Sequence, residues 1–300
     1  MKLAVTGGTG FVGSHFIEAA LAAGHEVCAL TRRPQRERER LEWVRGSLED
    51  PDALRMLVQN SDAVIHIAGV INGTAKQFET GNVAGTLAML AAATAAGTQR
   101  FVHVSSLAAR EPQLSKYGAS KAKAEGLVKG SGLKWVMVRP PAVFGPGDKE
   151  TLELFKMAKL RLMLLPPHGQ VSMIHVDDLA QLLLEVAVRA KPVHQVLEPD
   201  DGRTGGWSHK ELAAALGRAV GRKNLALSVP AGMLRLGALV DQLVRREKAK
   251  LSPDRAAYFS HSDWVCRQEL RPPPQLWAPQ IPTEQGLAET ASWYRAQGWL

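Results

Sequence analysis

The chain has no long hydrophobic run and only a few cysteines among its 300 residues. No stretch of about 18 consecutive apolar residues occurs, so the sequence predicts no transmembrane helix. The two cysteines, Cys28 and Cys266, form neither a disulfide framework nor a metal-ligand spacing, which favours a reducing cytoplasm. The nine histidines are scattered, and we predict no metal site. Because the first apolar stretch is short and runs straight into glycines, we expect a strand there rather than a secretory leader.

The net charge is +8, and basic residues cluster at 32–40 and 245–250. They are not interleaved with aromatic residues and no binding motif stands out, so we expect no nucleic-acid partner. Solvated loops and helix ends explain such clusters, and the alternative is an acidic partner such as a cofactor phosphate, a carrier protein or an anionic lipid surface. The amphipathic segment 231–250 favours burial, with a peripheral membrane contact as the alternative.

Strand and helix patterns alternate in the first half of the chain, which predicts an α/β fold with a Rossmann-type, doubly wound parallel sheet. Strands are expected at 2–6, 26–31, 63–67, 100–105 and 134–139, with a weak one at 42–45, and helices at 12–23, 52–59, 77–96 and 117–129. Turn-rich segments follow Pro140-Pro141, and a strand at 171–174 is expected to return to the sheet. We therefore predict a dinucleotide-binding domain at 1–150, with 171–200 returning to its sheet, and a smaller, mainly helical substrate domain at 151–300.

A glycine-spaced loop, Thr6 to Gly13, follows the first strand and opens a helix. Gly7 permits a tight turn, Gly10 allows the backbone to approach a pyrophosphate, and Gly13 allows close helix packing. The second strand ends in Leu30-Thr31-Arg32-Arg33 without the carboxylate that would hold the ribose of NAD. Arg32 and Arg33 suit a 2′-phosphate instead, so we favour NADP, with NAD as the alternative and exposed loop arginines as the structural explanation.

Tyr117 and Lys121 stand one helical turn apart, and Ser106 precedes them at the end of the fifth strand. A phenol is a poor acid–base catalyst at neutral pH unless a nearby cation favours its phenolate. These residue types therefore indicate hydride transfer at an alcohol or ketone, with a surface helix pair as the alternative explanation.

With these motifs the chain resembles the extended short-chain dehydrogenases/reductases, of the NAD(P)-dependent epimerase/dehydratase superfamily. The resemblance runs almost end to end and rests on short segments at 6–13, 66–69, 82–86, 104–106, 117–121, 139–140, 143–148 and 175–180. It implies that Tyr117 is the general acid/base, that Lys121 binds the nicotinamide ribose and keeps Tyr117 acidic, and that Ser106 hydrogen-bonds the substrate oxygen.

The resemblance also implies further cofactor contacts. Those in the glycine loop are Gly7, Thr9, Gly10, Phe11, Val12 and Gly13. Ala68 and Gly69 would pass under the diphosphate and ribose, while Pro140 and Val143 would line the nicotinamide side. Ser47, followed by Leu48, stands where the family usually has an aspartate for the adenine amino group, which weakens that contact. Asn82 is expected to be structural, or a water relay.

The stretch 155–165 is strongly apolar where nucleotide-sugar enzymes carry polar and basic residues, which favours an apolar substrate or simply a domain junction. We therefore expect an NADP-dependent oxidoreductase acting on a ketone or secondary alcohol of a fairly apolar small molecule. The alternatives are a nucleotide-sugar epimerase or dehydratase with tightly bound NAD, and a non-catalytic dinucleotide sensor or assembly subunit. Dimerisation through the helices at 77–96 and 117–129 is expected from the resemblance.

Overall fold

The computed structural model describes residues 1–166, 168–229, 232, 257–258 and 260–300, so the predicted helix at 231–250 lies outside the described residues except for Gly232. The chain divides into two compact units. The first comprises Met1–Pro140, Val176–Pro199 and Glu269–Ala278, and the second comprises Pro141–His175, Asp200–Gln268 and Pro279–Leu300. The division falls between two prolines rather than near residue 150.

The first unit is built on a seven-stranded sheet in the order β11-β6-β5-β4-β1-β2-β3, in which every pairing is parallel. Its strands are β1 (Lys2–Thr6), β2 (Glu26–Thr31), β3 (Leu41–Arg45), β4 (Ala63–His66), β5 (Arg100–Val104), β6 (Lys134–Val138) and β11 (Gln195–Leu197). The four central strands are almost entirely buried, as expected for apolar runs covered on both faces.

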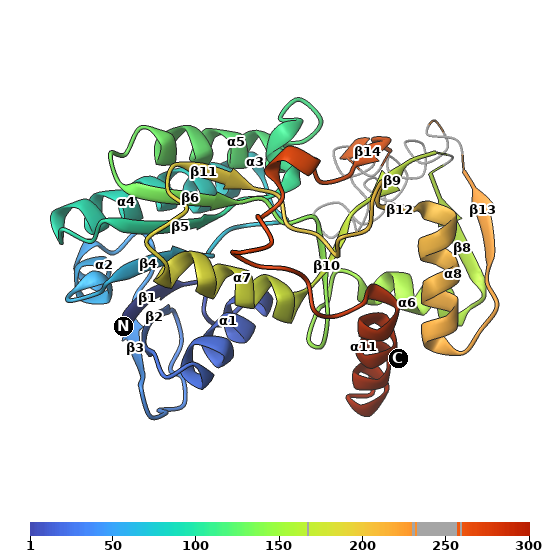
Figure 1. Ribbon diagram of the computed structural model, residues 1–300, viewed down its shortest axis with the longest axis horizontal. Helices are drawn as coiled ribbons and strands as arrows, with labels where there is room; N and C mark the ends of the chain where they lie inside the picture. The colour runs from blue at the N-terminus through green and yellow to red at the C-terminus, as the bar shows by residue number, and fades with distance from the viewer. Residues whose placement is uncertain (167, 230–231, 233–256, 259) are drawn as a thin grey trace. The chain divides into compact units, whose positions relative to one another are not determined.

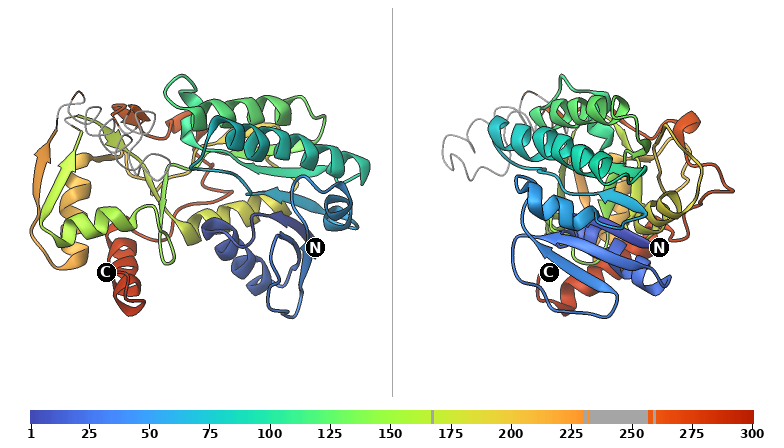
Figure 2. Two further views of the ribbon diagram at one scale, coloured as in Figure 1. Left: turned by 180° about the vertical axis from the view of Figure 1, so that it is seen from behind. Right: turned by 90° about the vertical axis from the view of Figure 1, so that its left-hand side faces the viewer.

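Helices cover both faces of this sheet (Figures 1 and 2). One face carries α2 (Pro51–Val58), α4 (Gly85–Ala95) and α5 (Lys116–Lys129), and the other carries α1 (Phe11–Ala22) and α7 (Val176–Val188). Side chains such as Leu57, Met89 and Val128 close the core on the first of these faces. The predicted doubly wound α/β fold is confirmed.

The strand order reverses at β1, which lies between β2 and β4. In sheets of this kind the helices leave the two neighbouring strands on opposite faces, and a crevice forms beyond their carboxyl ends. This reversal explains why the glycine loop after β1 and the segment after β4 lie together.

The predicted strand at 171–174 does not return to this sheet. Instead, β10 (Met173–His175) pairs with β7 (Ala142–Phe144) in the second unit, and β11 supplies the seventh strand beside β6. The prediction was wrong because β11 has only two apolar residues, too few for a strand pattern, whereas the segment before α7 is longer and more apolar.

The predicted helix at 77–96 is continuous but not uniform. It begins as α3 (Ala75–Phe78), widens to the π-helix η1 (Glu79–Ala84) and continues as α4. Such π segments often mark functional sites. The segment lies against α5, which carries Tyr117 and Lys121.

Among the residues that the structure describes, the second unit has three α-helices, α6 (Leu152–Lys159), α8 (His209–Val220) and α11 (Thr283–Ala296). It also has short strands that the sequence analysis did not predict: β9 (Gln170–Val171), β12 (Trp207–Ser208) and β14 (Asp263–Trp264) form one sheet, and β8 (Leu162–Leu165) pairs with β13 (Leu225–Ser228). Phe144, Phe155 and Tyr294 lie in its core. No helix among the described residues is both long and apolar enough to cross a bilayer.

Candidate functional site

The glycine loop brings the backbone of β1 and β4 into close contact. Gly7 adopts a positive φ of 77°, and a Cβ there would lie 2.7 Å from the Ala68 amide nitrogen. A Cβ on Gly13 would lie 2.1 Å from the Gly7 carbonyl oxygen. Only glycine fits these two positions, because any side chain would displace backbone.

The N-terminus of α1 follows this loop. Gly10 is its N-cap, donates its own amide to the Gly7 carbonyl oxygen at 2.9 Å, and has no side chain to cap the helix. No acidic residue stands in the first turn. Uncapped amides at the positive end of a 12-residue helix suit an anionic group, so these residues fit a dinucleotide pyrophosphate.

His66 at the end of β4 links the end of β1 to α4 through hydrogen bonds that the sequence analysis did not predict. Its Nδ1 lies 2.7 Å from Thr6 Oγ1, which also accepts the Ala68 amide at 3.2 Å. Its Nε2 lies 3.1 Å from Thr86 Oγ1, and the Thr86 hydroxyl donates to the Asn82 carbonyl oxygen at 2.6 Å. Because the Thr86 proton is engaged there, His66 donates from Nε2 and accepts at Nδ1. Burial lowers the pKa of His66 to about 3, so this residue is neutral.

Lys121 lies on the buried face of α5 and donates from Nζ to the Val104 carbonyl oxygen at 2.8 Å. A Cβ on Gly69 would lie 3.3 Å from this nitrogen, so the ammonium group borders the segment after β4. Burial lowers the pKa of Lys121 to about 8, and the Glu125 carboxylate, one turn further along α5, acts in the opposite direction.

Tyr117 is half-buried in the first turn of α5, with its ring centroid 6.1 Å from that of Phe78. Burial raises its pKa, and a hydrogen bond with the Ser106 side chain acts in the opposite direction. The lowered pKa that the sequence analysis expected from Lys121 is therefore not observed, because burial outweighs the other influences on this phenol in the protein alone.

The two serines after β5 have different partners. The Ser105 hydroxyl is buried and donates to Glu125 Oε1 at 2.6 Å. Ser106 is half-buried, and its oxygen accepts the Ala108 amide at 3.2 Å while its side chain also interacts with Tyr117. The structure thus brings Ser106 and Tyr117 together, and it engages Ser105 elsewhere.

A chain of buried charges lies behind α5 and was also missed by the sequence analysis. Arg139 donates to both oxygens of Glu125, at 2.8 and 2.7 Å, and to Glu198 at 3.2 Å. Arg110 lies 3.4 Å from the other Glu198 oxygen. No signal in the sequence joins these residues, because they come from α5, the end of β6, the end of β11 and the turn after β5.

The side chain of Asn82 in the π-helix forms three hydrogen bonds with two residues. Its Oδ1 accepts the Val70 amide at 2.6 Å, and its amide nitrogen donates to the Val70 carbonyl oxygen at 2.9 Å and to Ser120 Oγ at 2.8 Å. Ser120 in turn donates to the Tyr117 carbonyl oxygen at 2.7 Å. Asn82 thus ties the segment after β4 to the turn of α5 that holds Tyr117, which is a structural use.

The residues predicted for the adenine end lie beyond β2 and β3. Arg32 and Arg33 are exposed, and neither side chain forms a salt bridge with any residue that the structure describes. Ser47 Oγ accepts the Glu49 amide at 3.2 Å, and Leu48 packs where a side chain on Gly85 would clash. Pro140 ends the first segment of the first unit, and its carbonyl oxygen accepts the Leu107 amide, whereas Val143 belongs to the second unit.

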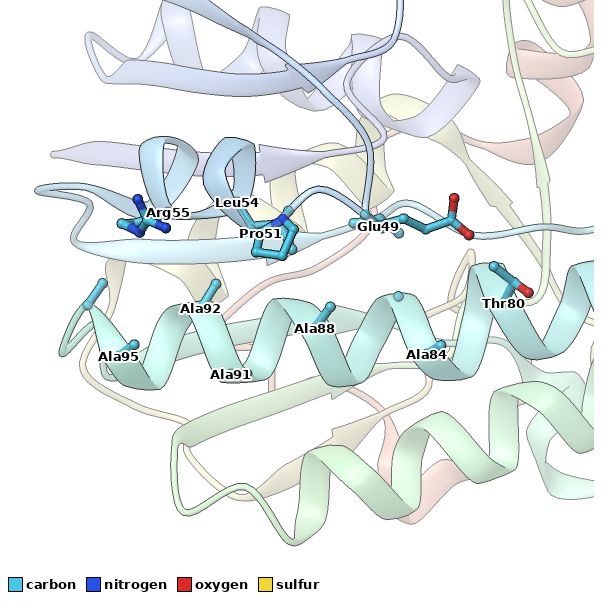
Figure 3. Close-up of a pocket in the computed structure, with 13 residues that line it drawn as sticks. Glu49, Pro51, Leu54, Arg55, Thr80, Ala84, Ala88, Ala91, Ala92 and Ala95 are labelled. Carbon is cyan, nitrogen blue, oxygen red and sulfur yellow. The ribbon is translucent and has the colours of Figure 1, made fainter.

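A groove of about 600 Å³ lies between α2 and α4 (Figure 3). Its walls are mainly alanines of α4, such as Ala88 and Ala92, which face Leu54 and Pro51 of α2. Leu48 lines it, but Ser106, Tyr117 and Lys121 do not. The groove is therefore distinct from the candidate catalytic residues.

Comparison with known proteins identifies the family. The model of the NAD dependent epimerase/dehydratase family matches residues 3–196, about two-thirds of the chain. The chain belongs to this family. It is therefore an NAD(P)-dependent enzyme of the short-chain dehydrogenase/reductase superfamily.

Several curated relatives of this chain are named as reductases. The chain is 38% identical to a ceramide reductase of Caulobacter vibrioides, over 99% of this chain and 96% of the relative. It is 34% identical to 4-hydroxy-2-methyl-3-oxo-4-farnesyl-3,4-dihydroquinoline-1-oxide ketoreductase of Stigmatella aurantiaca, over 49% of this chain and 52% of the relative. Among solved structures, MoeE5 in complex with UDP-glucuronic acid and NAD has the same fold, with a TM-score of 0.76 and 21% identity over 99% of both chains.

Proposed function

We propose that this enzyme reduces a ketone on a long-chain, lipid-like molecule to the secondary alcohol, with NADPH as the reductant. The observation that carries the proposal is the half-buried Ser106–Tyr117 pair, with a buried Lys121 one turn further along α5. The relatives support the substrate class, since ceramide and a farnesyl-bearing quinoline both combine polar groups with long apolar chains. The apolar segment at 155–165 agrees with a substrate of this kind.

The preference for NADPH rests on Arg32 and Arg33. Both follow β2 directly, and both guanidinium groups are exposed and form no salt bridge with the described residues. Thr31 Oγ1 holds the turn by donating to the Arg33 carbonyl oxygen at 2.7 Å and accepting the Arg33 amide at 3.2 Å. A rigid turn that presents two arginines favours a phosphate over a ribose hydroxyl.

The remaining cofactor contacts would come from the glycine loop and its neighbours. Gly7, Gly10 and Gly13, with Thr9, Phe11 and Val12, would hold the pyrophosphate against α1, and Ala68 and Gly69 would lie beneath it. Ser47 and Leu48 would border the adenine, and Pro140 and Val143 the nicotinamide. When bound, the reduced nicotinamide supplies the hydride to the carbonyl carbon.

The side chains of the enzyme handle the proton. In the ground state a raised pKa keeps Tyr117 protonated, as a proton donor must be. Tyr117 donates this proton to the carbonyl oxygen as it gains negative charge, and the Ser106 hydroxyl donates a hydrogen bond to the same oxygen. The positive charge of Lys121 stabilises the phenolate that remains until solvent returns a proton.

We also propose an oligomeric state and a location. The resemblance to the family supports a homodimer formed through the helices at 77–96 and 117–129, and the scarcity of cysteine supports a cytoplasmic location.

The test is turnover of a ceramide analogue whose secondary alcohol is replaced by a ketone, presented in detergent micelles. Consumption of NADPH in proportion to alcohol formed, with slower turnover on NADH, is expected. If the purified enzyme instead carries tightly bound NAD and converts a nucleotide sugar without net change in the cofactor, the proposal is wrong and the enzyme is an epimerase or dehydratase.

A further inference from the structure

The small sheet formed by β8 and β13 in the second unit exposes one of its faces. The two strands run parallel, with Leu162 beside Leu225 and Leu164 beside Leu227. These four side chains, which we call the leucine face, are 42%, 60%, 48% and 44% exposed in that order. Figure 1 shows the two strands side by side, next to α8.

The opposite face of the same sheet is buried. Met163 is only 1% exposed and lies in the core of the second unit, and Ala226 packs against the same core. Since successive side chains of a strand alternate between faces, burial of Met163 forces Leu162 and Leu164 outward. Parallel strands normally have both faces covered, so four leucines left open by the described part of the chain point to a surface that contacts another molecule.

The chain segments that form and flank the leucine face are basic, and two of their cations, Lys156 and Arg218, pair with Glu153 and Glu284 outside these segments. No acidic residue occurs in segments 154–165 and 212–228, which contain both strands. Lys159, Arg161 and Lys223 are exposed, and none forms a salt bridge within the described part of the chain. The Arg161 carbonyl oxygen accepts the Leu225 amide at 2.9 Å, which places this basic residue at the edge of the sheet.

We propose that the leucine face and its basic rim dock onto an anionic lipid bilayer. Leucines that enter the interface gain hydrophobic free energy, while lysines and arginines around them attract anionic headgroups. A protein partner is a poorer match, because protein interfaces are enriched in aromatic residues and depleted of lysine, and the leucine face has no aromatic residue. The proposal rests in part on the proposed function, since a lipid ketone would itself reside in the bilayer.

Vesicle binding of the full chain tests the proposal. We expect wild-type protein to co-sediment with vesicles that contain phosphatidylglycerol and only weakly with vesicles of phosphatidylcholine alone. The double variant Leu164→Gln/Leu227→Gln should lose about tenfold or more in partitioning, because two apolar side chains no longer enter the bilayer. Met56→Gln, which changes a 59% exposed side chain on α2, is the matched control and should bind as wild type does.

A second arm tests the charges without touching the strands. Lys159→Gln/Lys223→Gln should weaken binding to anionic vesicles about fivefold for each lysine. Lys129→Gln/Lys134→Gln, which removes two exposed lysines of the first unit, should have little effect. This arm keeps the proposal testable if the leucine variant fails to fold.

Turnover of a short-chain, water-soluble ketone separates this proposal from the proposed function. Normal turnover by the leucine variant, together with lost vesicle binding, supports docking. If both pairs of substitutions leave vesicle binding unchanged, or if the leucine variant changes only the oligomeric state, the docking proposal is overturned while the proposed function stands. If the wild-type protein instead reduces no ketone and still binds vesicles in a way that depends on the leucine face, that result overturns only the proposed function.

Discussion

At the level of single residues, burial raises the pKa of Tyr117, so the protein without its cofactor holds this phenol in its protonated form. A phenol that stays protonated can donate its proton to a carbonyl oxygen. Forming the buried phenolate that remains then costs free energy. In the proposed reaction the phenolate therefore has to be stabilised by a cation, a role that we assign to Lys121.

Substitution of Tyr117 by Phe removes the proposed proton donor without changing ring volume. We expect turnover to fall by about two to four orders of magnitude while NADPH affinity changes little, because general acid catalysis contributes that much. Steady-state cofactor absorbance and calorimetry with NADPH measure the two effects. Tyr258→Phe in the second unit is a control that should turn over normally, and nearly normal turnover by Tyr117→Phe would reject the assignment.

Cofactor choice also belongs to single residues. The double variant Arg32→Ala/Arg33→Ala should raise the KM for NADPH about 10- to 100-fold and leave the KM for NADH nearly unchanged, since charge-assisted hydrogen bonds to the extra phosphate are lost. Arg36→Ala, an exposed arginine of the same loop, serves as control. Equal effects on both cofactors would mean that these arginines do not read the phosphate.

At the level of elements, Glu125 links α5 to its neighbours. It accepts from Ser105 and from Arg139, and its charge favours the protonated form of Lys121. The carboxylate therefore has two separable effects, one on packing between α5 and the strand ends and one on the proton affinity of the lysine.

Glu125→Gln should show both effects. Stability should fall by about 1–3 kcal/mol, because Arg139 loses one charged partner but keeps the other, Glu198. The pKa of Lys121, about 8 with Glu125 present, should fall further, because the influence that opposes burial is removed. Lys121 then loses its proton at lower pH, so the alkaline limb of the pH–kcat profile moves to lower pH.

Glu79→Gln is the matched control for this variant. Glu79 forms an exposed ion pair at 3.1 Å with Lys123, which lies on α5 as Glu125 does. Exposed pairs contribute little, about 0–1 kcal/mol. Chemical denaturation and pH–rate profiles of both variants decide the matter. Lower stability with an unmoved alkaline limb would make Glu125 purely structural.

At the level of the whole molecule, the sequence predicted the features that neighbouring residues encode. The glycine loop, the strands of the sheet apart from β11 and the short spacing of Tyr117 and Lys121 are local patterns. Pairing of Arg139 with Glu198 joins residues 59 apart, and β8 pairs with a strand more than 50 residues later. Such contacts depend on the folded chain, so no local pattern reports them. The sequence analysis also predicted one uniform helix at 77–96 and did not foresee the π-helix, in which Asn82 hydrogen-bonds to Val70.

Two buried histidines couple the stability of the molecule to pH. His66 and His103 are paired neighbours on β4 and β5, with stacked rings whose centroids are 5.5 Å apart. Neither ring nitrogen of His103 has a hydrogen-bond partner among the described residues. Burial lowers the pKa of His66 to about 3 and that of His103 well below 6.5.

The sign of the effect follows from proton binding. As pH falls through about 6.5, the unfolded chain takes up protons on these two side chains and the folded protein does not. Stability is therefore lost on acidification, by up to about 1.4 kcal/mol per pH unit for each histidine below that pH. The loss continues until the folded protein also binds the protons, which for His66 is near pH 3.

His103→Leu isolates one of the two protons. Between about pH 5 and pH 6, the slope of the free energy of unfolding against pH should fall by up to about 1.4 kcal/mol per pH unit, which is the contribution of one proton. The variant should also be more stable than wild type at about pH 5, because it buries neither a titratable ring nor two ring nitrogens without partners. Urea denaturation at several pH values measures both quantities, with the exposed His168→Gln as control. An unchanged slope in His103→Leu would show that His103 accepts its proton in the folded protein as readily as in the unfolded chain, and that the linkage comes from other groups.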